Sequence, residues 1–248
     1  DRSRGLEDVY KRQLGQFALY RACCDLQSIG ELTLSVNISP AQFRDPEFET
    51  RVVQVLARCH FPARRLQIEV TESYVMENPA RALAAIENLK ALGAAVALDD
   101  FGIGYSSIGY LRSFRFDTLK IDKSLAGLVD VDAQAAELVR GTVRIAGALG
   151  MTVVAEGVEN QQQLALLRRS GLRVLILDYQ QISDLSPLAE LPLEYLSLTG
   201  NQVSDLSPLA GLTKLQVLNL GENPVRTAEG VAPVSYTHLR AHETDQYL

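Results

Sequence analysis

Residues 94–100 read AAVALDD, and this segment indicates the fold class. A short run of small and β-branched apolar residues that ends in adjacent carboxylates is typical of a buried parallel strand. Similar runs occur at residues 34–39 (LSVNIS), 66–71 (LQIEVT), 118–122 (TLKID) and 152–155 (TVVA). Helical patterns separate them, which predicts parallel βα units. A β/α barrel and a doubly wound sheet both fit this alternation.

Helix start and stop signals support that alternation. Ser39 and Asp45 each precede a proline and are predicted N-caps, and Asn78 opens a further helix. Helices are also predicted over residues 133–149 and 161–169, each followed closely by a glycine. The pattern therefore predicts five strands and their intervening helices between residues 14 and 171.

The pattern changes after residue 171. The motif L-x-x-L-x-L occurs at residues 172–177, 193–198 and 215–220, at offsets of 21 and 22 residues, and SDLSPLA occurs twice, at residues 183–189 and 204–210. This periodicity resembles that of leucine-rich repeats, so we predict a short solenoid over residues 172–233. Residues 172–177 could instead dock beside residues 152–155 as a surrogate barrel strand.

Polar residues have specific places in these repeats. Asn201 and Asn223 fall where each turn needs a buried amide to satisfy backbone groups, and Gln180 takes that place in the first repeat. The strand positions that include Tyr195 and Ser197 are either merely solvated or a face for a protein partner. The pattern alone leaves both readings open.

Composition excludes several classes of partner. The 248 residues are 47% hydrophobic and 22% charged, and the net charge is −6. No polybasic run is present, so we expect no nucleic-acid polymer as partner. No apolar run reaches the roughly 18 residues of a membrane span. Cys23, Cys24 and Cys59 are too few for a disulfide framework, and we expect buried thiols in a reducing, cytoplasmic compartment.

Both ends of the sequence differ from the rest. Residues 1–13 (DRSRGLEDVYKRQ) and 234–248 (VSYTHLRAHETDQYL) are polar and lack sustained periodicity. Both resemble translated sequencing-adapter tails, and natural disordered termini are the alternative. We therefore expect neither end to belong to the folded domains.

Polar residues gather at the carboxyl ends of the predicted strands, where a β/α barrel forms its active site. These residues are Asn37, Glu69, Glu72, Asp99, Asp100, Lys120, Glu156 and Glu159. Converging carboxylates repel one another unless a cation lies between them, and oxygen ligands suit Mg²⁺ or Mn²⁺. A single acid at a strand end is usually a helix cap, and Lys120 could simply pair with Asp122. Four successive strand ends with the same chemistry favour a metal site for phosphodiester hydrolysis.

Five sequence blocks carry a family resemblance. SVNISPAQF, LQIEVTES, ALDDFGIGYSS, FDTLKIDKS and VVAEGVE occur in this order. They closely resemble the signature blocks of EAL-domain proteins, the cyclic di-GMP phosphodiesterases. The resemblance covers about 155 residues and implies a TIM-like (β/α) barrel that cleaves cyclic di-GMP to pGpG with two Mg²⁺ or Mn²⁺ ions.

The same resemblance assigns roles to individual residues. It implies metal ligation by Asn37, Glu69, Asp99, Asp100 and Glu156. It implies that Lys120 holds the attacking water, that Glu159 supports the site, and that Glu72 anchors the loop of residues 101–107. Within that loop, Phe101, Gly102, Gly104 and Ser106 would couple dimerisation through the barrel to the site, although Ile103 stands where the family commonly has threonine.

Two family segments are not found. The namesake Glu-Ala-Leu strand is expected upstream of Leu14, and the closing Gln-Gly-Tyr strand is expected after Gly171, where the repeats begin. We therefore predict an incomplete barrel over residues 14–171 and a chain that hydrolyses cyclic di-GMP poorly or not at all. The alternatives are a degenerate EAL domain that only binds cyclic di-GMP, and a leucine-rich repeat protein that binds another protein.

Overall fold

The computed structural model describes residues 2–27, 33–103, 108–158, 160–170, 172–189, 191–225 and 235–237. Two compact units divide the chain, residues 1–120 with 149–151 and residues 121–148 with 152–248. Among the described residues, none of the helices combines the length and the apolar character that a membrane crossing needs.

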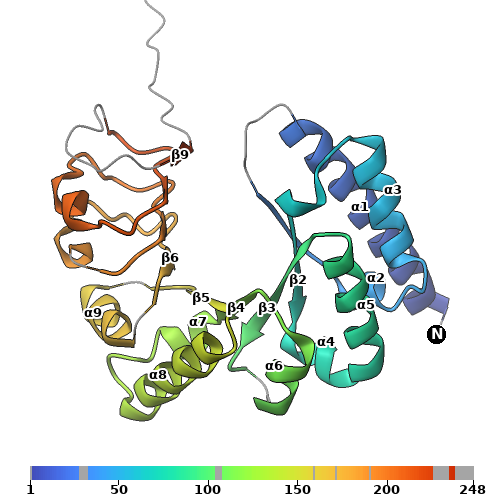
Figure 1. Ribbon diagram of the computed structural model, residues 1–248, viewed down its shortest axis with the longest axis horizontal. Coiled ribbons are helices and arrows are strands. Elements are labelled where there is room, and N and C mark those ends of the chain that lie inside the picture. The colour runs from blue at the N-terminus through green and yellow to red at the C-terminus, as the bar shows by residue number, and fades with distance from the viewer. Residues whose placement is uncertain are drawn as a thin grey trace, which may run out of the picture. The chain divides into compact units, whose positions relative to one another are not determined.

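The first unit is built on parallel strands in chain order (Figure 1). They are β1 (Leu34–Asn37), β2 (Leu66–Thr71), β3 (Ala95–Phe101) and β4 (Thr118–Ile121), whose last residue belongs to the second unit. β2 pairs in parallel with β1 and with β3. These strands confirm the predicted incomplete β/α barrel. β1 is two residues shorter than predicted, and β3 runs two residues further, to Phe101.

β3 forms where the sequence is apolar on both faces. Val96, Ala97 and Leu98 of β3 are fully buried. Complete burial of a valine or leucine side chain contributes roughly 1.5–3 kcal/mol. Asp117 fixes the start of this strand, because its Oδ2 accepts from Val96 N at 2.8 Å and its own N donates to Val96 O at 2.9 Å.

Helices join and cover these strands. Their bounds are α1 (Arg2–Gln27), α2 (Pro40–Phe43), α3 (Phe48–Arg58), the 3₁₀ helix η1 (Ala63–Arg65), α4 (Glu72–Glu77), α5 (Pro79–Ala91) and α6 (Ile108–Phe114). Ser39 caps α2 in a reciprocal capping box with Gln42, and Asn78 caps α5 through Arg81 N, as predicted. Asp45 differs from its predicted role, because its side chain accepts from Glu47 N ahead of α3.

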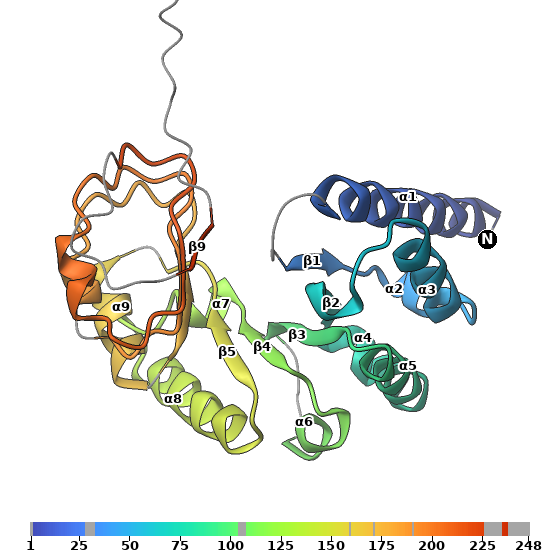
Figure 2. The same cartoon turned by 45° about the horizontal axis from the view of Figure 1, so that its top comes forward.

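Helix α1 packs along α3 (Figure 2). Cys59 Sγ lies 3.4 Å from Tyr20 O, and Arg65 Nη2 donates to Leu26 O at 3.0 Å. Cys23 and Cys59 are buried free thiols, as expected, whereas the free thiol of Cys24 is only half-buried. The helical backbone of α1 also includes residues 2–13, which the sequence suggested to be a separate tail.

The second unit continues the βα pattern into the repeats. It contains α7 (Lys123–Ala126), α8 (Ala133–Ala148), β5 (Thr152–Ala155), α9 (Gln161–Ser170) and β6 (Val174–Ile176). β6 pairs in parallel with β5, with Val154 opposite Val174. The first repeat strand therefore docks on the last barrel strand, as the sequence allowed. Asp122 caps α7 through Ser124 N and is not part of β4.

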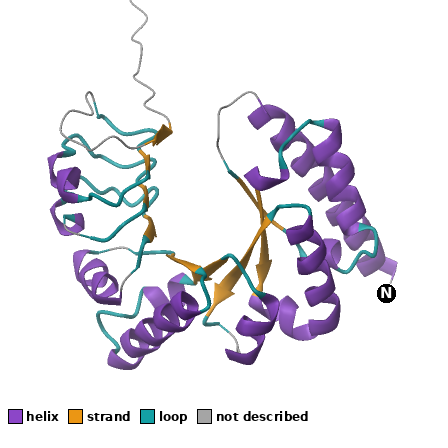
Figure 3. Cartoon of the chain, viewed as in Figure 1, coloured by secondary structure: helices purple, strands orange, loops and turns teal. Residues whose placement is uncertain are grey.

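Leucine-rich coils follow β6, with strands on one side and 3₁₀ turns on the other (Figure 3). They comprise η2 (Ser186–Leu188), β7 (Tyr195–Ser197), η3 (Ser207–Gly211), β8 (Val217–Asn219) and β9 (Ser235–Thr237). β7 pairs in parallel with β6 and β8, and Leu196 and Leu218 are buried, which confirms the predicted solenoid. β9, within the segment suggested to be a tail, pairs with β8.

Asparagine side-chain amides hold the repeat turns. Asn201 Oδ1 accepts from Gln180 N at 3.0 Å and Ile182 N at 2.9 Å, and its Nδ2 donates to Leu177 O and Leu198 O. Asn223 does the same one repeat later, where its Oδ1 accepts from Val203 N. Asn201 is buried as predicted, whereas Asn223 makes its bonds from a half-buried position.

The strand face of the repeats is less solvated than one reading of the sequence suggested. Ser197 is buried and donates to Asp178 Oδ1 at 2.7 Å. The same oxygen accepts from Thr199 N at 2.8 Å. Asp178 therefore ties β6 to β7 on this face.

Candidate metal site at the strand ends

Three candidate ligands share one face of the first sheet. Asn37 of β1 pairs with Glu69 of β2, and Thr71 of β2 pairs with Asp99 of β3. Paired residues of a sheet share a face, and so do residues two apart on a strand. Asn37, Glu69 and Asp99 therefore lie on the same face. Glu69 and Asp99 are buried, and Asn37 is exposed at the end of its strand.

Lys120 joins the two carboxylates. Its Nζ donates to Glu69 Oε2 at 2.9 Å and lies 3.3 Å from Asp99 Oδ1. All three side chains are only 7–12% exposed. The bridge spans β3, because β2 and β4 lie on either side of that strand. The predicted convergence of these residues is thus present in the first unit.

The backbone turns sharply at the end of β3. Asp100 has a φ of +57°, in the left-handed region that aspartate tolerates better than most residues, and Gly102 follows with a φ of +107°. Asp100 N donates to Asp99 Oδ1 at 3.0 Å, so this turn orients the Asp99 carboxylate.

Glu72 opens α4 and is 1% exposed. Its Oε2 accepts from Gly102 N at 3.1 Å, directly after Phe101, the last residue of β3. Its Oε1 is buried and has no hydrogen-bond partner within the described part of the chain. Glu72 thus contacts the start of the loop that the family resemblance assigned to it, whereas Gly104 and Ser106 lie outside the described residues.

The remaining two candidates follow β5 in the second unit. Glu156 is half-buried, and its N donates to Ile121 O at 3.1 Å. This bond continues the strand pairing by one residue beyond Ala155. Glu159 lies outside the described residues.

Sequence reasoning missed a second polar layer on the same face. Ser35, Gln67 and Thr118 stand two residues before Asn37, Glu69 and Lys120 on their respective strands. Ser35 Oγ donates to Glu69 Oε1 at 2.5 Å. The period-two polar pattern of three strands is the signal that would have identified this layer.

The donor chemistry fits a divalent cation. Carboxylate and amide oxygens are the hard ligands that such ions prefer. The Lys120 ammonium shows that the oxygens of Glu69 and Asp99 already converge on a positive charge. Among the described residues, no group of three acidic, histidine or cysteine side chains forms a complete ligand cage. Glu69 and Asp99 are therefore candidate ligands for such an ion.

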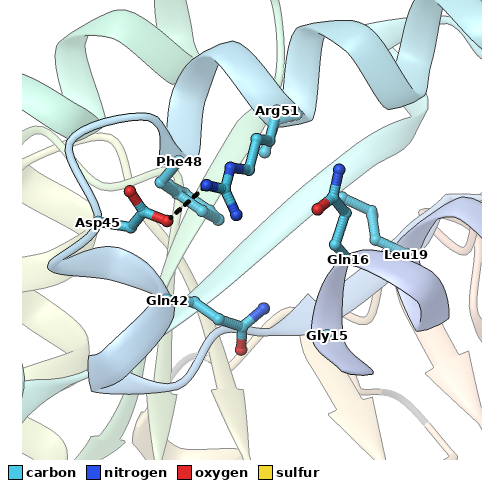
Figure 4. A pocket seen from close by; sticks show the side chains of 8 residues that line it. Gly15, Gln16, Leu19, Gln42, Asp45, Phe48 and Arg51 are labelled. Carbon is cyan, nitrogen blue, oxygen red and sulfur yellow. Dashed lines mark ion pairs between the residues drawn. The ribbon is translucent and has the colours of Figure 1, made fainter. Parts of the chain in front are cut away.

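A small cavity elsewhere in the first unit is no alternative site. It measures about 20 Å³ and is lined by residues of α1, of α3 and of the α2 region, including the 3.3 Å ion pair of Asp45 and Arg51 (Figure 4). A cavity needs roughly 10–15 Å³ by this measure to hold one water molecule. It therefore has room for about one water molecule and for no larger ligand.

Comparisons with known proteins match two families. The family model described as the EAL domain matches residues 6–176, and the model described as Leucine Rich repeats (2 copies) matches residues 193–233. The first match thus includes β6, and the second begins just before β7.

Individual proteins and solved structures also resemble part of this chain. Cyclic di-GMP phosphodiesterase PdeR of Escherichia coli (strain K12) is 39% identical over 141 residues, which are 57% of this chain and 21% of that protein. The structure of the PaMucR phosphodiesterase in complex with c-di-GMP has a TM-score of 0.61 and 33% identity, over 64% of this chain and 67% of that chain.

The Klebsiella pneumoniae BlrP1 complex with manganese and cyclic di-GMP has a TM-score of 0.60 and 26% identity, over 66% of this chain and 42% of that chain. This chain spans about a fifth of the length of the curated relatives it matches.

Proposed function

Because this chain belongs to the EAL domain family, we propose that residues 14–171 act as a metal-dependent phosphodiesterase that hydrolyses cyclic di-GMP to pGpG. The observation that carries the proposal is the convergence of Glu69 and Asp99 on Lys120 at the strand ends. The names of the relatives PdeR and PaMucR support the reaction and the nucleotide.

The metal in this proposal is Mg²⁺ or Mn²⁺, held by oxygen ligands. Those ligands are Asn37, Glu69, Asp99, Asp100 and Glu156. The manganese and calcium complexes of BlrP1 support a divalent ion. A bound divalent ion lowers the pKa of a coordinated water and offsets phosphodiester charge.

The other residues act around these ligands. The Lys120 ammonium reaches both carboxylates, so it can position a water molecule or offset negative charge on the phosphodiester. Glu72 holds the first turn of the loop after β3 through Gly102 N. We extend this role to the remaining loop residues Gly104 and Ser106, and assign Glu159 a supporting role near Glu156.

Partners and compartment follow from the same proposal. A homodimer through the barrel would act on the loop after β3, and a protein partner would bind the strand face of the repeats. Val174, Tyr195 and Val217 support the latter, because they are paired in register and only half-buried. The three free thiols suit a reducing compartment such as the cytoplasm.

The test is the release of pGpG from cyclic di-GMP, followed by chromatography with Mn²⁺ present and then removed by a chelator. We expect slow release that needs Mn²⁺, because β6 places the apolar Val174 beside β5 where the family has its closing strand. Asp99→Asn should abolish release, and Asp205→Asn, an exposed aspartate of the repeats, should not.

Measuring cyclic di-GMP binding separately from its hydrolysis distinguishes an enzyme from a receptor. Binding of cyclic di-GMP without any pGpG would instead support a receptor. Failure of the chain to bind cyclic di-GMP would refute the proposal.

A further inference from the structure

The structure assigns Ser35, Gln67 and Thr118 a positioning role, as a hydrogen-bonded ladder that orients Glu69 toward the cation site. This inference rests on the proposed function, because it concerns how Glu69 binds the metal. These three residues make up the ladder. Each stands two positions before a residue of the candidate site on the same strand, namely Asn37 on β1, Glu69 on β2 and Lys120 on β4.

The ladder is a directed chain of donors. Thr118 Oγ1 donates to Gln67 Oε1 at 3.2 Å, and Gln67 Nε2 donates to Ser35 Oγ at 2.9 Å. Ser35 Oγ then donates to Glu69 Oε1 at 2.5 Å. Gln67 and Ser35 each accept one bond and donate the next, so the donated hydrogens all point toward the carboxylate.

The direction of these hydrogen bonds determines whether Ser35 can donate to the Glu69 carboxylate. A serine hydroxyl has a single hydrogen, and the bond accepted from Gln67 leaves that hydrogen free for Glu69. Thr118 in turn fixes which end of the Gln67 amide faces Ser35. Successive bonds in such a chain polarise and strengthen one another.

Glu69 is thereby held from both sides. Ser35 engages Oε1, and Lys120 engages Oε2. Two separate contacts fix the carboxylate plane, whereas one would leave it free to rotate. Partners that orient a metal ligand in this way typically change metal affinity or activity by about 10–100-fold when they are removed.

Small residues on the middle strand make the ladder possible. β3 lies between β2 and β4, yet Thr118 meets Gln67 and Lys120 meets Glu69. The β3 residues paired with Gln67 and Glu69 are Ala95 and Ala97. A methyl side chain at both positions lets the longer side chains meet over β3.

Mn²⁺ titration followed by electron paramagnetic resonance tests the ladder without any turnover. We expect Ser35→Ala and Thr118→Val each to weaken Mn²⁺ binding about tenfold, the lower end of that range, because Ser35 is exposed. Ser35→Thr keeps the hydroxyl and should restore affinity. The matched controls are Ser113→Ala on α6 and Thr152→Val, at the first position of β5.

A further comparison separates positioning from general structural support. In a Glu69→Gln background, Ser35→Ala should weaken the remaining Mn²⁺ binding no further, because the carboxylate that it orients is gone. Thermal unfolding should be alike for Ser35→Ala and Ser113→Ala.

The outcomes distinguish the positioning role of the ladder from the proposed metal-dependent function. Unchanged Mn²⁺ affinity in both ladder variants, or equal losses in the controls, would overturn the ladder and leave the proposed function standing. A wild-type chain that binds no Mn²⁺ would overturn the ladder and the metal-dependent function together.

Discussion

Replacing Lys120 with methionine removes the ammonium group between Glu69 and Asp99 and keeps a side chain of similar length. The two carboxylate oxygens lie 2.9 and 3.3 Å from the same nitrogen, so they are at most about 6 Å apart. Both side chains are at most 12% exposed, so water screens them weakly. We therefore expect the first unit to become markedly less stable.

The magnitude follows from Coulomb's law. Two unit charges about 6 Å apart at an effective dielectric constant of about 20 repel by about 3 kcal/mol. Removing one partner of a buried ion pair typically costs about 3–5 kcal/mol, which is of the same size. Mn²⁺ should recover part of this loss, because a divalent ion supplies the positive charge that the variant lacks.

Hydrogen–deuterium exchange of peptides covering β2 and β3 measures the free energy of opening at this site. Lys90→Met is the matched control, because Lys90 pairs with Asp117 at 2.6 Å but is 31% exposed and its partner 41% exposed. Pairs this open contribute up to about 1 kcal/mol. Equal losses in the two variants, or no protection by Mn²⁺ in Lys120→Met, would show that Lys120 does not offset the repulsion between Glu69 and Asp99.

Three further predictions concern other parts of the chain. Burial raises the pKa of Cys59 to about 12, so at pH 8 its thiol should be alkylated far more slowly in the native chain than in urea, as measured by mass spectrometry. Asn201→Ala leaves several buried backbone groups without partners, at roughly 1–3 kcal/mol each, and should open the repeats in hydrogen exchange more than Asn219→Ala does. Burial favours a higher pKa for Glu49, but hydrogen bonds from Arg81 outweigh it and hold the pKa of Glu49 below its usual value. Glu49→Gln should therefore lower the free energy of unfolding at pH 7, and the difference from wild type should vanish as the pH falls through that lowered pKa.

Strand positions and the main candidate ligands were predictable because their signals are local. Residues 66–71 alternate apolar and polar residues, residues 152–155 are largely apolar, and the two runs form β2 and β5 with the expected bounds. Glu69 and Asp99 stand near the ends of such runs, so parallel pairing alone brings them to one face.

Contacts that depend on strand order were not predictable. Thr118 and Gln67 lie on strands that are separated by β3, and their side chains meet across β3 because it carries alanines there. The sequences of these two strands do not indicate which strand lies between them. The burial of Ser197 was missed for the same reason, since its partner Asp178 belongs to the preceding coil.

Every strand of the second unit from β5 to β8 pairs with the strand that follows it in the chain. The first-listed partners of each pairing are 20, 21, 22 and 18 positions apart. Contacts at such short separations close small loops, and small loops form quickly. Each coil therefore contacts only the coils next to it in the chain. We expect this part of the chain to add coils in chain order once the first few have stacked, so that its folding can keep pace with its synthesis.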